Sequence, residues 1–155
     1  MSLSRKSTSG ISLLELLIVL AIFAIIGSGL VISLRQADRR ALNNASLQLQ
    51  ADLRYAQRLA IIEGRRHGIV FEVENNRYRI IATAPERTIR TVYLQNGVRL
   101  VETSGDRLVF LPRGTVSGGF RINLGIGPYY QRLTATVSGG RIRIFDISTT
   151  LEREY

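Results

Sequence analysis

Three patterns of hydrophobic and polar positions follow one another along the chain. Residues 11–34 are apolar almost throughout, and Glu15 is their only ionisable side chain. From residue 35 to about residue 63, apolar residues recur at intervals of three or four, which is the spacing of one helical face. These apolar positions are Leu42, Ala45, Leu49, Leu53, Ala56 and Ala60. From Gly68 onward the period changes to two, which is typical of β-strands.

The first two patterns predict one long helix. It ends near Glu63, because Gly64 supplies a stop signal. Its first half is long enough to cross the core of a bilayer, which takes a helix of ~20 residues. Its second half is apolar on one face only, and we expect that face to pack on the sheet formed by the following strands.

The strand region predicts a hairpin of residues 69–73 and 77–81 around the turn 74–76. Because no helical pattern interrupts the later strands, the sheets should be mainly antiparallel. The predicted fold class is α+β, with one long N-terminal helix, transmembrane in its first half and amphipathic in its second, packed on a mainly antiparallel β-sheet domain. The further strands are predicted at residues 90–94, 98–101, 107–110, 120–124, 133–137 and 141–147.

Composition limits the classes of protein and site. A chain of 155 residues has room for one soluble domain after the apolar segment. It has no cysteine, which excludes disulfides and thiolate metal sites. The net charge is +9, and Lys6 is the only lysine among 21 basic residues. This bias towards arginine either reflects genomic base composition or suits bidentate contacts with phosphate or carboxylate groups.

The N-terminal residues and Glu15 bear on how the chain meets the membrane. Arg5 and Lys6 precede the apolar segment, and the positive-inside rule therefore keeps the N-terminus in the cytoplasm and sends the C-terminal domain out. A carboxylate such as Glu15 inside an apolar span costs roughly 2.5–3.5 kcal/mol. Either Glu15 reaches water near the cytoplasmic end, or a cut after Gly10 makes Ile11 a new N-terminus. Its ammonium group could then pair with Glu15 of the neighbouring subunit.

Residues 10–15 followed by the apolar run resemble the class III leader of type IV pilins and type II secretion pseudopilins. The resemblance implies that a prepilin peptidase cleaves after Gly10 and methylates Ile11, and that Glu15 registers subunits in the filament. Ile11 stands where the family most often has Phe. The alternative is cleavage by signal peptidase within residues 28–33.

Later motifs narrow the resemblance. The stretches 51–61, 110–114 and 140–143 are similar to those of the GspH/FimT group of minor pseudopilins and minor pilins, although Gln57 stands where that group commonly has Arg. The implied organisation is a leader peptide (1–10), a transmembrane and filament-core helix (11–34), its amphipathic continuation (35–64) and a β-rich GspH/FimT-like globular domain (65–155).

Two functions follow from this resemblance. One is a structural role in a type II secretion pseudopilus or type IV pilus, in protein secretion or pilus assembly. The alternative is a FimT-like minor pilin that binds DNA for uptake in natural transformation. In FimT-like proteins, arginines of the C-terminal region contact DNA, and the resemblance implies the same role for Arg141 and Arg143 of this chain.

The charge pattern leaves both functions open. Between Asp106 and Asp146 there is no acidic residue, and six arginines lie there. They form a candidate phosphate footprint, because neutralising the backbone dominates nucleic-acid affinity. Alternatively, their stems cover apolar surface, or they meet acids on a neighbouring subunit. Arg107 is one of the six, and the candidate DNA-binding residues are the other five: Arg113, Arg121, Arg132, Arg141 and Arg143.

The implied partners are the prepilin peptidase, other pilin or pseudopilin subunits, the inner-membrane assembly platform and, for the alternative function, DNA. The implied location is the cytoplasmic (inner) membrane, with a single pass, the N-terminus inside and the C-terminal domain periplasmic, and a filament after assembly. We expect no enzymatic activity, cofactor or metal. His67 is the only histidine, at a helix-to-strand junction, and no carboxylate cluster accompanies it.

Overall fold

The computed structural model describes residues 13–137 and 140–147, with the backbone alone for residues 26–35. One helix, α1 (Leu13–Ile62), precedes eight strands. Gly64 follows the helix with a φ of +60°, the left-handed conformation that ends many helices. The predicted α+β class and the predicted end of the helix are confirmed. The strands are β1 (His67–Glu72), β2 (Arg77–Thr83), β3 (Glu86–Tyr93), β4 (Arg99–Thr103), β5 (Arg107–Phe110), β6 (Phe120–Ile126), β7 (Tyr129–Ala135) and β8 (Ile142–Ile147).

The chain divides into two compact units, residues 1–36 and 37–155. In the first unit, the side chains of residues 13–25 are exposed, with Leu13 at 78% and Phe23 at 68%. No helix of the described residues is both long and apolar enough to cross a membrane. Residues 11 and 12 of the predicted span, and the side chains of residues 26–35, lie outside the described part. The span stays a prediction.

The second unit contains two antiparallel sheets of four strands each. The first sheet has the order β3-β2-β1-β5, and the second sheet has the order β4-β6-β7-β8. The predicted hairpin is confirmed, because β1 pairs with β2. Two strands begin four residues earlier than predicted: β3 begins at Glu86 rather than residue 90, and β7 begins at Tyr129 rather than residue 133. Gly127, with a φ of +51°, makes the turn tight enough for the strand to start at Tyr129.

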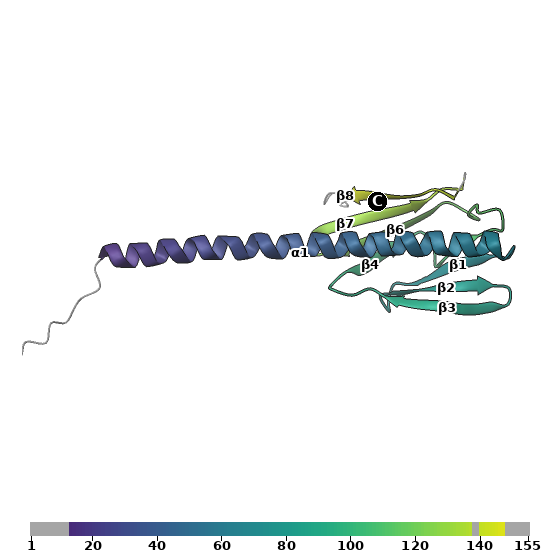
Figure 1. The fold of residues 1–155 in the computed structure, drawn as a ribbon, viewed down its shortest axis with the longest axis horizontal. Coiled ribbons are helices and arrows are strands. Elements are labelled where there is room, and N and C mark those ends of the chain that lie inside the picture. Colours follow the sequence, from purple (N-terminus) through teal and green to yellow (C-terminus); the bar gives the residue numbers. More distant parts are fainter. Residues whose placement is uncertain (1–12, 138–139, 148–155) are drawn as a thin grey trace, which may run out of the picture. The chain divides into compact units, whose positions relative to one another are not determined.

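The amphipathic half of α1 lies across both sheets (Figure 1). Leu49, Leu53, Ala56 and Ala60 are fully buried, as the spacing of apolar residues predicts. Each fully buried leucine contributes about 1.5–3 kcal/mol relative to an exposed one. The same core includes residues from the inner faces of both sheets: Ile69, Tyr78, Ile80, Ile122, Leu124 and Leu133. One face of the helix therefore holds the two sheets together.

The buried face of this helix, which the spacing predicts to be apolar, also contains the charged residue Asp52. Asp52 is only 3% exposed. Its carboxylate accepts a hydrogen bond from the Tyr78 hydroxyl at 2.7 Å and pairs with the Arg90 guanidinium. Burial raises the pKa of Tyr78 above its usual range, and the hydroxyl therefore remains a donor. Partners on β2 and β3 thus stabilise the buried negative charge of Asp52, and these contacts hold the helix to the first sheet.

Replacing Asp52 with Ala should lower the free energy of unfolding by about 2–4 kcal/mol. The substitution leaves the buried Tyr78 hydroxyl without its acceptor and Arg90 without its counter-charge, and the exposure of Arg90 moderates the loss. Urea unfolding of the full chain in micelles of an uncharged detergent, followed by near-ultraviolet circular dichroism of the tyrosines, measures it. Glu74→Ala, which removes an exposed carboxylate, should change the value by less than about 0.5 kcal/mol. Equal effects of the two substitutions would contradict the buried network.

Asn76 joins the hairpin of the first sheet to the start of the second sheet. Its Nδ2 donates to the carbonyl oxygen of Val98 at 2.9 Å, and its Oδ1 accepts from the backbone nitrogen of Leu100 at 2.8 Å. Its φ of +48° lies in the left-handed region, which Asn tolerates better than most residues. The predicted Asn-rich turn therefore also positions β4.

Candidate functional site

The predicted maturation site lies outside the described part of the chain, because Gly10 and Ile11 are not described. Glu15 lies in the first turn of α1 with an exposed side chain. A carboxylate is favourable there, because the first turn of a helix carries partial positive charge. Its role in subunit registry stays a prediction.

Three short motifs, far apart in the sequence, meet around the side chain of Gln57. Its Nε2 donates to the carbonyl oxygen of Gly114 at 2.6 Å and to that of Gly140 at 3.4 Å. Both glycines have positive φ, and a Cβ on Gly140 would lie 2.4 Å from the Gly114 oxygen. The stretches 51–61, 110–114 and 140–143 thus form one structural junction, and Gln57, the departure from the group's pattern, is the residue that links them.

Arg141 and Arg143 lie next to this junction. Both are exposed, and Ile142 between them is buried, as the predicted alternation requires. They line a hollow of about 280 Å³ together with Arg54 and Gln57 of the helix. Arg54 is not among the predicted site residues, because nothing in the local pattern relates a helical residue to β8. Arg113, which is exposed in the loop after β5, does not line this hollow.

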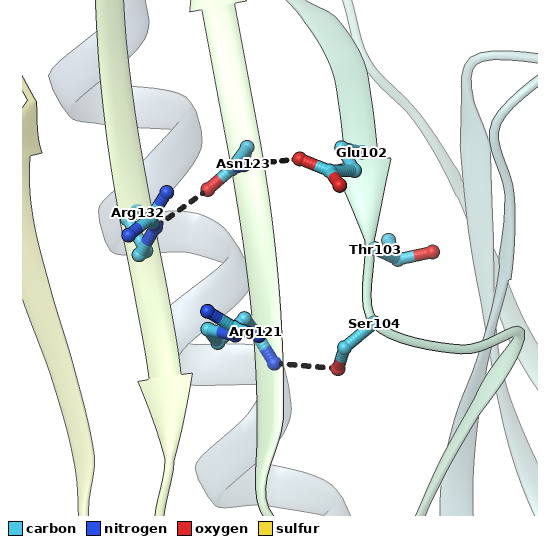
Figure 2. Close-up of a pocket in the computed structure, with 6 residues that line it drawn as sticks. All are labelled: Glu102, Thr103, Ser104, Arg121, Asn123 and Arg132. Carbon is cyan, nitrogen blue, oxygen red and sulfur yellow. Dashed lines mark hydrogen bonds between the residues drawn. The ribbon is translucent and has the colours of Figure 1, made fainter. Parts of the chain in front are cut away.

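Arg121 and Arg132 belong to a different hollow, of about 190 Å³, on the second sheet (Figure 2). Arg132 donates through Nε to Asn123 Oδ1 at 3.0 Å, and Asn123 donates through Nδ2 to Glu102 at 2.9 Å. The backbone nitrogen of Arg121 donates to Ser104 Oγ at 2.9 Å. The helix lies behind the strands in this view, which places the hollow on the sheet face that points away from the core. Its lining residues are Glu102, Thr103, Ser104, Arg121, Asn123 and Arg132.

The acid-free window of the sequence is not free of acids in space. Glu102 precedes the window, but β4 pairs with β6 and brings its carboxylate to Asn123 beside the two arginines. Arg107, also in the window, lies on the first sheet and pairs with Glu86 at 3.3 Å. Strand pairing therefore separates Arg107 from the other five arginines and places an acid beside Arg121 and Arg132, and binding of DNA by the five candidate arginines stays a prediction.

The first sheet pairs its charges internally. Glu72 accepts hydrogen bonds from Asn75, Arg77 and Arg79, which lower the pKa of its carboxyl to about 2. Because the folded pKa is depressed, the stabilisation from this cluster is present above the unfolded pKa and is lost as the pH falls towards about 2. In contrast, none of the five candidate DNA-binding arginines forms an ion pair within the described residues.

The two tyrosines after the β6–β7 turn make contacts inside the domain. The guanidinium of Arg39, on the helix, lies 4.6 Å from the centre of the Tyr129 ring. The Tyr130 ring covers Gly125, where an added Cβ would lie 2.8 Å from the ring. These contacts anchor the β6–β7 turn to the rest of the domain.

The described residues form no candidate metal site, and the contacts of His67 are local. No group of three or more potential metal-ligating side chains occurs there. His67 is buried at the start of β1, with Nε2 3.2 Å from Glu63 and Nδ1 3.3 Å from the carbonyl oxygen of Arg65. It therefore makes local contacts at the helix-to-strand junction.

Comparison with known proteins gives two family matches. Residues 45–141 match the model described as type II transport protein GspH, and residues 5–31 match the prokaryotic N-terminal methylation motif. No curated protein matches the sequence significantly.

Two solved structures share the fold. The minor pseudopilin EpsH from the type II secretion system of Vibrio cholerae has a TM-score of 0.59 at 18% identity, and the match covers 68% of this chain and 96% of EpsH. The type IV minor pilin FimU of Pseudomonas aeruginosa has a TM-score of 0.58 at 18% identity, and the match covers 69% of this chain and 90% of FimU.

Proposed function

Since the chain belongs to the GspH family of type II transport proteins, and is thereby a minor pseudopilin or minor pilin, we propose that it enters its filament through the first half of α1. The observation that carries this proposal is the order of the two family matches. The methylation motif occupies residues 5–31, and the GspH domain follows at residues 45–141.

The proposed sequence of events begins in the cytoplasmic membrane. The chain is held there by a single pass through residues 11–34, with its N-terminus inside and its β-sheet domain in the periplasm. Prepilin peptidase removes residues 1–10 and methylates Ile11. The exposed apolar side chains of residues 13–25 then exchange lipid for the corresponding helices of other subunits, with the help of the assembly platform.

Glu15 sets the register in this process. In an apolar bundle of helices, its carboxylate needs a compensating charge, and the ammonium group of Ile11 on the neighbouring subunit provides one. The work of the chain is then non-covalent assembly, and we expect neither catalysis nor a cofactor.

DNA uptake, the alternative function, is not favoured. The matched family is named for type II transport, and the two structural relatives are described as a minor pseudopilin and a minor pilin. The surface also argues against a continuous phosphate track, because Glu102 lies beside Arg132 and Asn123 and because Arg107 is already paired with Glu86.

The content of sheared filaments tests the proposal. Quantitative mass spectrometry of filaments from the host should find the chain in far fewer copies than the major subunit. In a strain without prepilin peptidase, the chain should disappear from this fraction. A chain that stays wholly in the envelope of cells that make filaments would contradict the proposed function.

A further inference from the structure

The second sheet presents an outer face whose chemistry changes along the strands. Pairing of β6 with β7 and of β7 with β8 aligns its side chains in rows. One row is cationic, the next combines polar and charged residues with Phe145, and the last is apolar and lies towards the β6–β7 turn. The rows are Arg121, Thr134 and Arg143; Glu102, Asn123, Arg132 and Phe145; and Val101, Gly125, Tyr130 and Ile147.

Two guanidinium groups are available at the cationic end of this outer face. Arg121 and Arg132 are diagonal neighbours on β6 and β7 and line the same hollow (Figure 2). Within the described residues, the Arg121 guanidinium makes no hydrogen bond and Arg132 uses only Nε. Asn123, which is 4% exposed, holds that Nε in place. The remaining N–H groups have the fork geometry that binds a carboxylate in a bidentate manner.

We propose that the outer face of the second sheet binds an acidic segment of another protein, one of whose Asp or Glu carboxylates enters the hollow between Arg121 and Arg132. The hollow of about 190 Å³ is smaller than the roughly 300–1,000 Å³ of sites for drug-sized ligands. It therefore suits a single side-chain head group.

The neighbouring rows favour a protein over a nucleic acid. Phe145 and Val101 are 46% and 44% exposed on the same face. Exposed aromatic and arginine side chains together are typical of the central residues of protein interfaces. A run of phosphates, in contrast, would pass the Glu102 carboxylate and the apolar side chains of Phe145 and Val101, and both contacts are unfavourable for phosphates.

The partner is a protein other than this chain. A second copy is also strongly basic and would bring further positive charge to a face that is already cationic. An acidic partner gains attraction at Arg121 and Arg132 and buries apolar surface at Phe145. This inference goes beyond the proposed function, because entry into a filament does not by itself require an acidic partner on this face. The binding test does not require filament assembly, and it can therefore fail or succeed independently of the proposed function.

The binding test uses the full chain in micelles of an uncharged detergent. The probe is a short dye-labelled peptide that alternates Glu with Phe, and fluorescence anisotropy measures its affinity at low and physiological salt. The double variant Arg121→Gln/Arg132→Gln should bind the peptide roughly ten-fold or more weakly. The matched control Arg58→Gln/Arg87→Gln removes the same charge from exposed sites elsewhere and should stay within about three-fold.

Weaker binding by the double variant could also result from loss of folding, and a variant that gains affinity excludes this explanation. Glu102→Gln removes the carboxylate next to the hollow and keeps an acceptor for Asn123, and it should bind the acidic peptide several-fold more tightly. The proposal is overturned by absence of peptide binding at low salt, by equal losses in both double variants, or by unchanged affinity of Glu102→Gln. It is also overturned if a single-stranded oligonucleotide of matched charge binds more tightly and loses affinity in the same double variant.

Discussion

Replacing Glu15 with Ala is expected to abolish incorporation of the chain into filaments while leaving removal of the leader intact. The carboxylate lies in the first turn of α1, within an otherwise apolar segment. Without it, the ammonium group of the neighbouring subunit's N-terminus would be buried in the bundle without a partner. Breaking such a pair costs about 3–5 kcal/mol, which corresponds to depletion by roughly a hundred-fold or more.

Immunoblotting of the sheared filament fraction and of whole cells measures both parts of this prediction. The mature chain should be present in the cells and missing from the filaments. Asp38→Ala, which removes a carboxylate beyond the apolar segment of the same helix, serves as the control and should be incorporated normally. Normal incorporation of Glu15→Ala would refute the registry role.

The second large effect is expected at the leader. Replacing Gly10 with Val should leave the chain as an unprocessed precursor, because the peptidase must approach the backbone closely at the cleaved bond and only glycine has no Cβ. The size of the product on denaturing gels measures this. Ser7→Val places the same side chain further from the bond and should still be processed.

Accumulation of a mature-size product from Gly10→Val would mean that another protease acts on the chain. Signal peptidase cleavage within residues 28–33 predicts instead a product that is shorter than the mature chain and lacks most of the apolar segment. The two proteases are therefore distinguished by the length of the product.

Local patterns predict the elements of this fold well. Gly64 marks the end of the helix, and the three-to-four spacing identifies the helical face that becomes buried, from Leu42 to Ala60. The alternation of polar and apolar residues identifies every strand region, although the ends of β3 and β7 differ by several residues. These features depend on residues that are close together in the sequence.

Local patterns do not predict which distant strands pair with each other. Nothing in the sequence indicates that β1 pairs with β5 and β4 with β6, or that the strands divide into two sheets. This pairing brings Glu102 next to Asn123, and the stretch without acids in the sequence therefore has an acidic neighbour in the structure.

Burial of Asp52 was missed for the same reason. Read along the helix, Asp52 is one polar residue among several, and its compensation comes from Tyr78 and Arg90 on later strands. The junction at Gln57 also depends on distant partners, since Gly114 and Gly140 lie in two loops near the end of the chain. The motifs could be recognised in the sequence, but their contact could not.

The most direct test of the central claim, that this chain is a processed subunit of a filament, is the mass of its N-terminal peptide in purified filaments. A processed subunit gives a peptide that begins at Ile11 and carries one methyl group on its amino nitrogen. A peptide that retains residues 1–10, or that begins at any other residue, would show that the chain is not processed in this way.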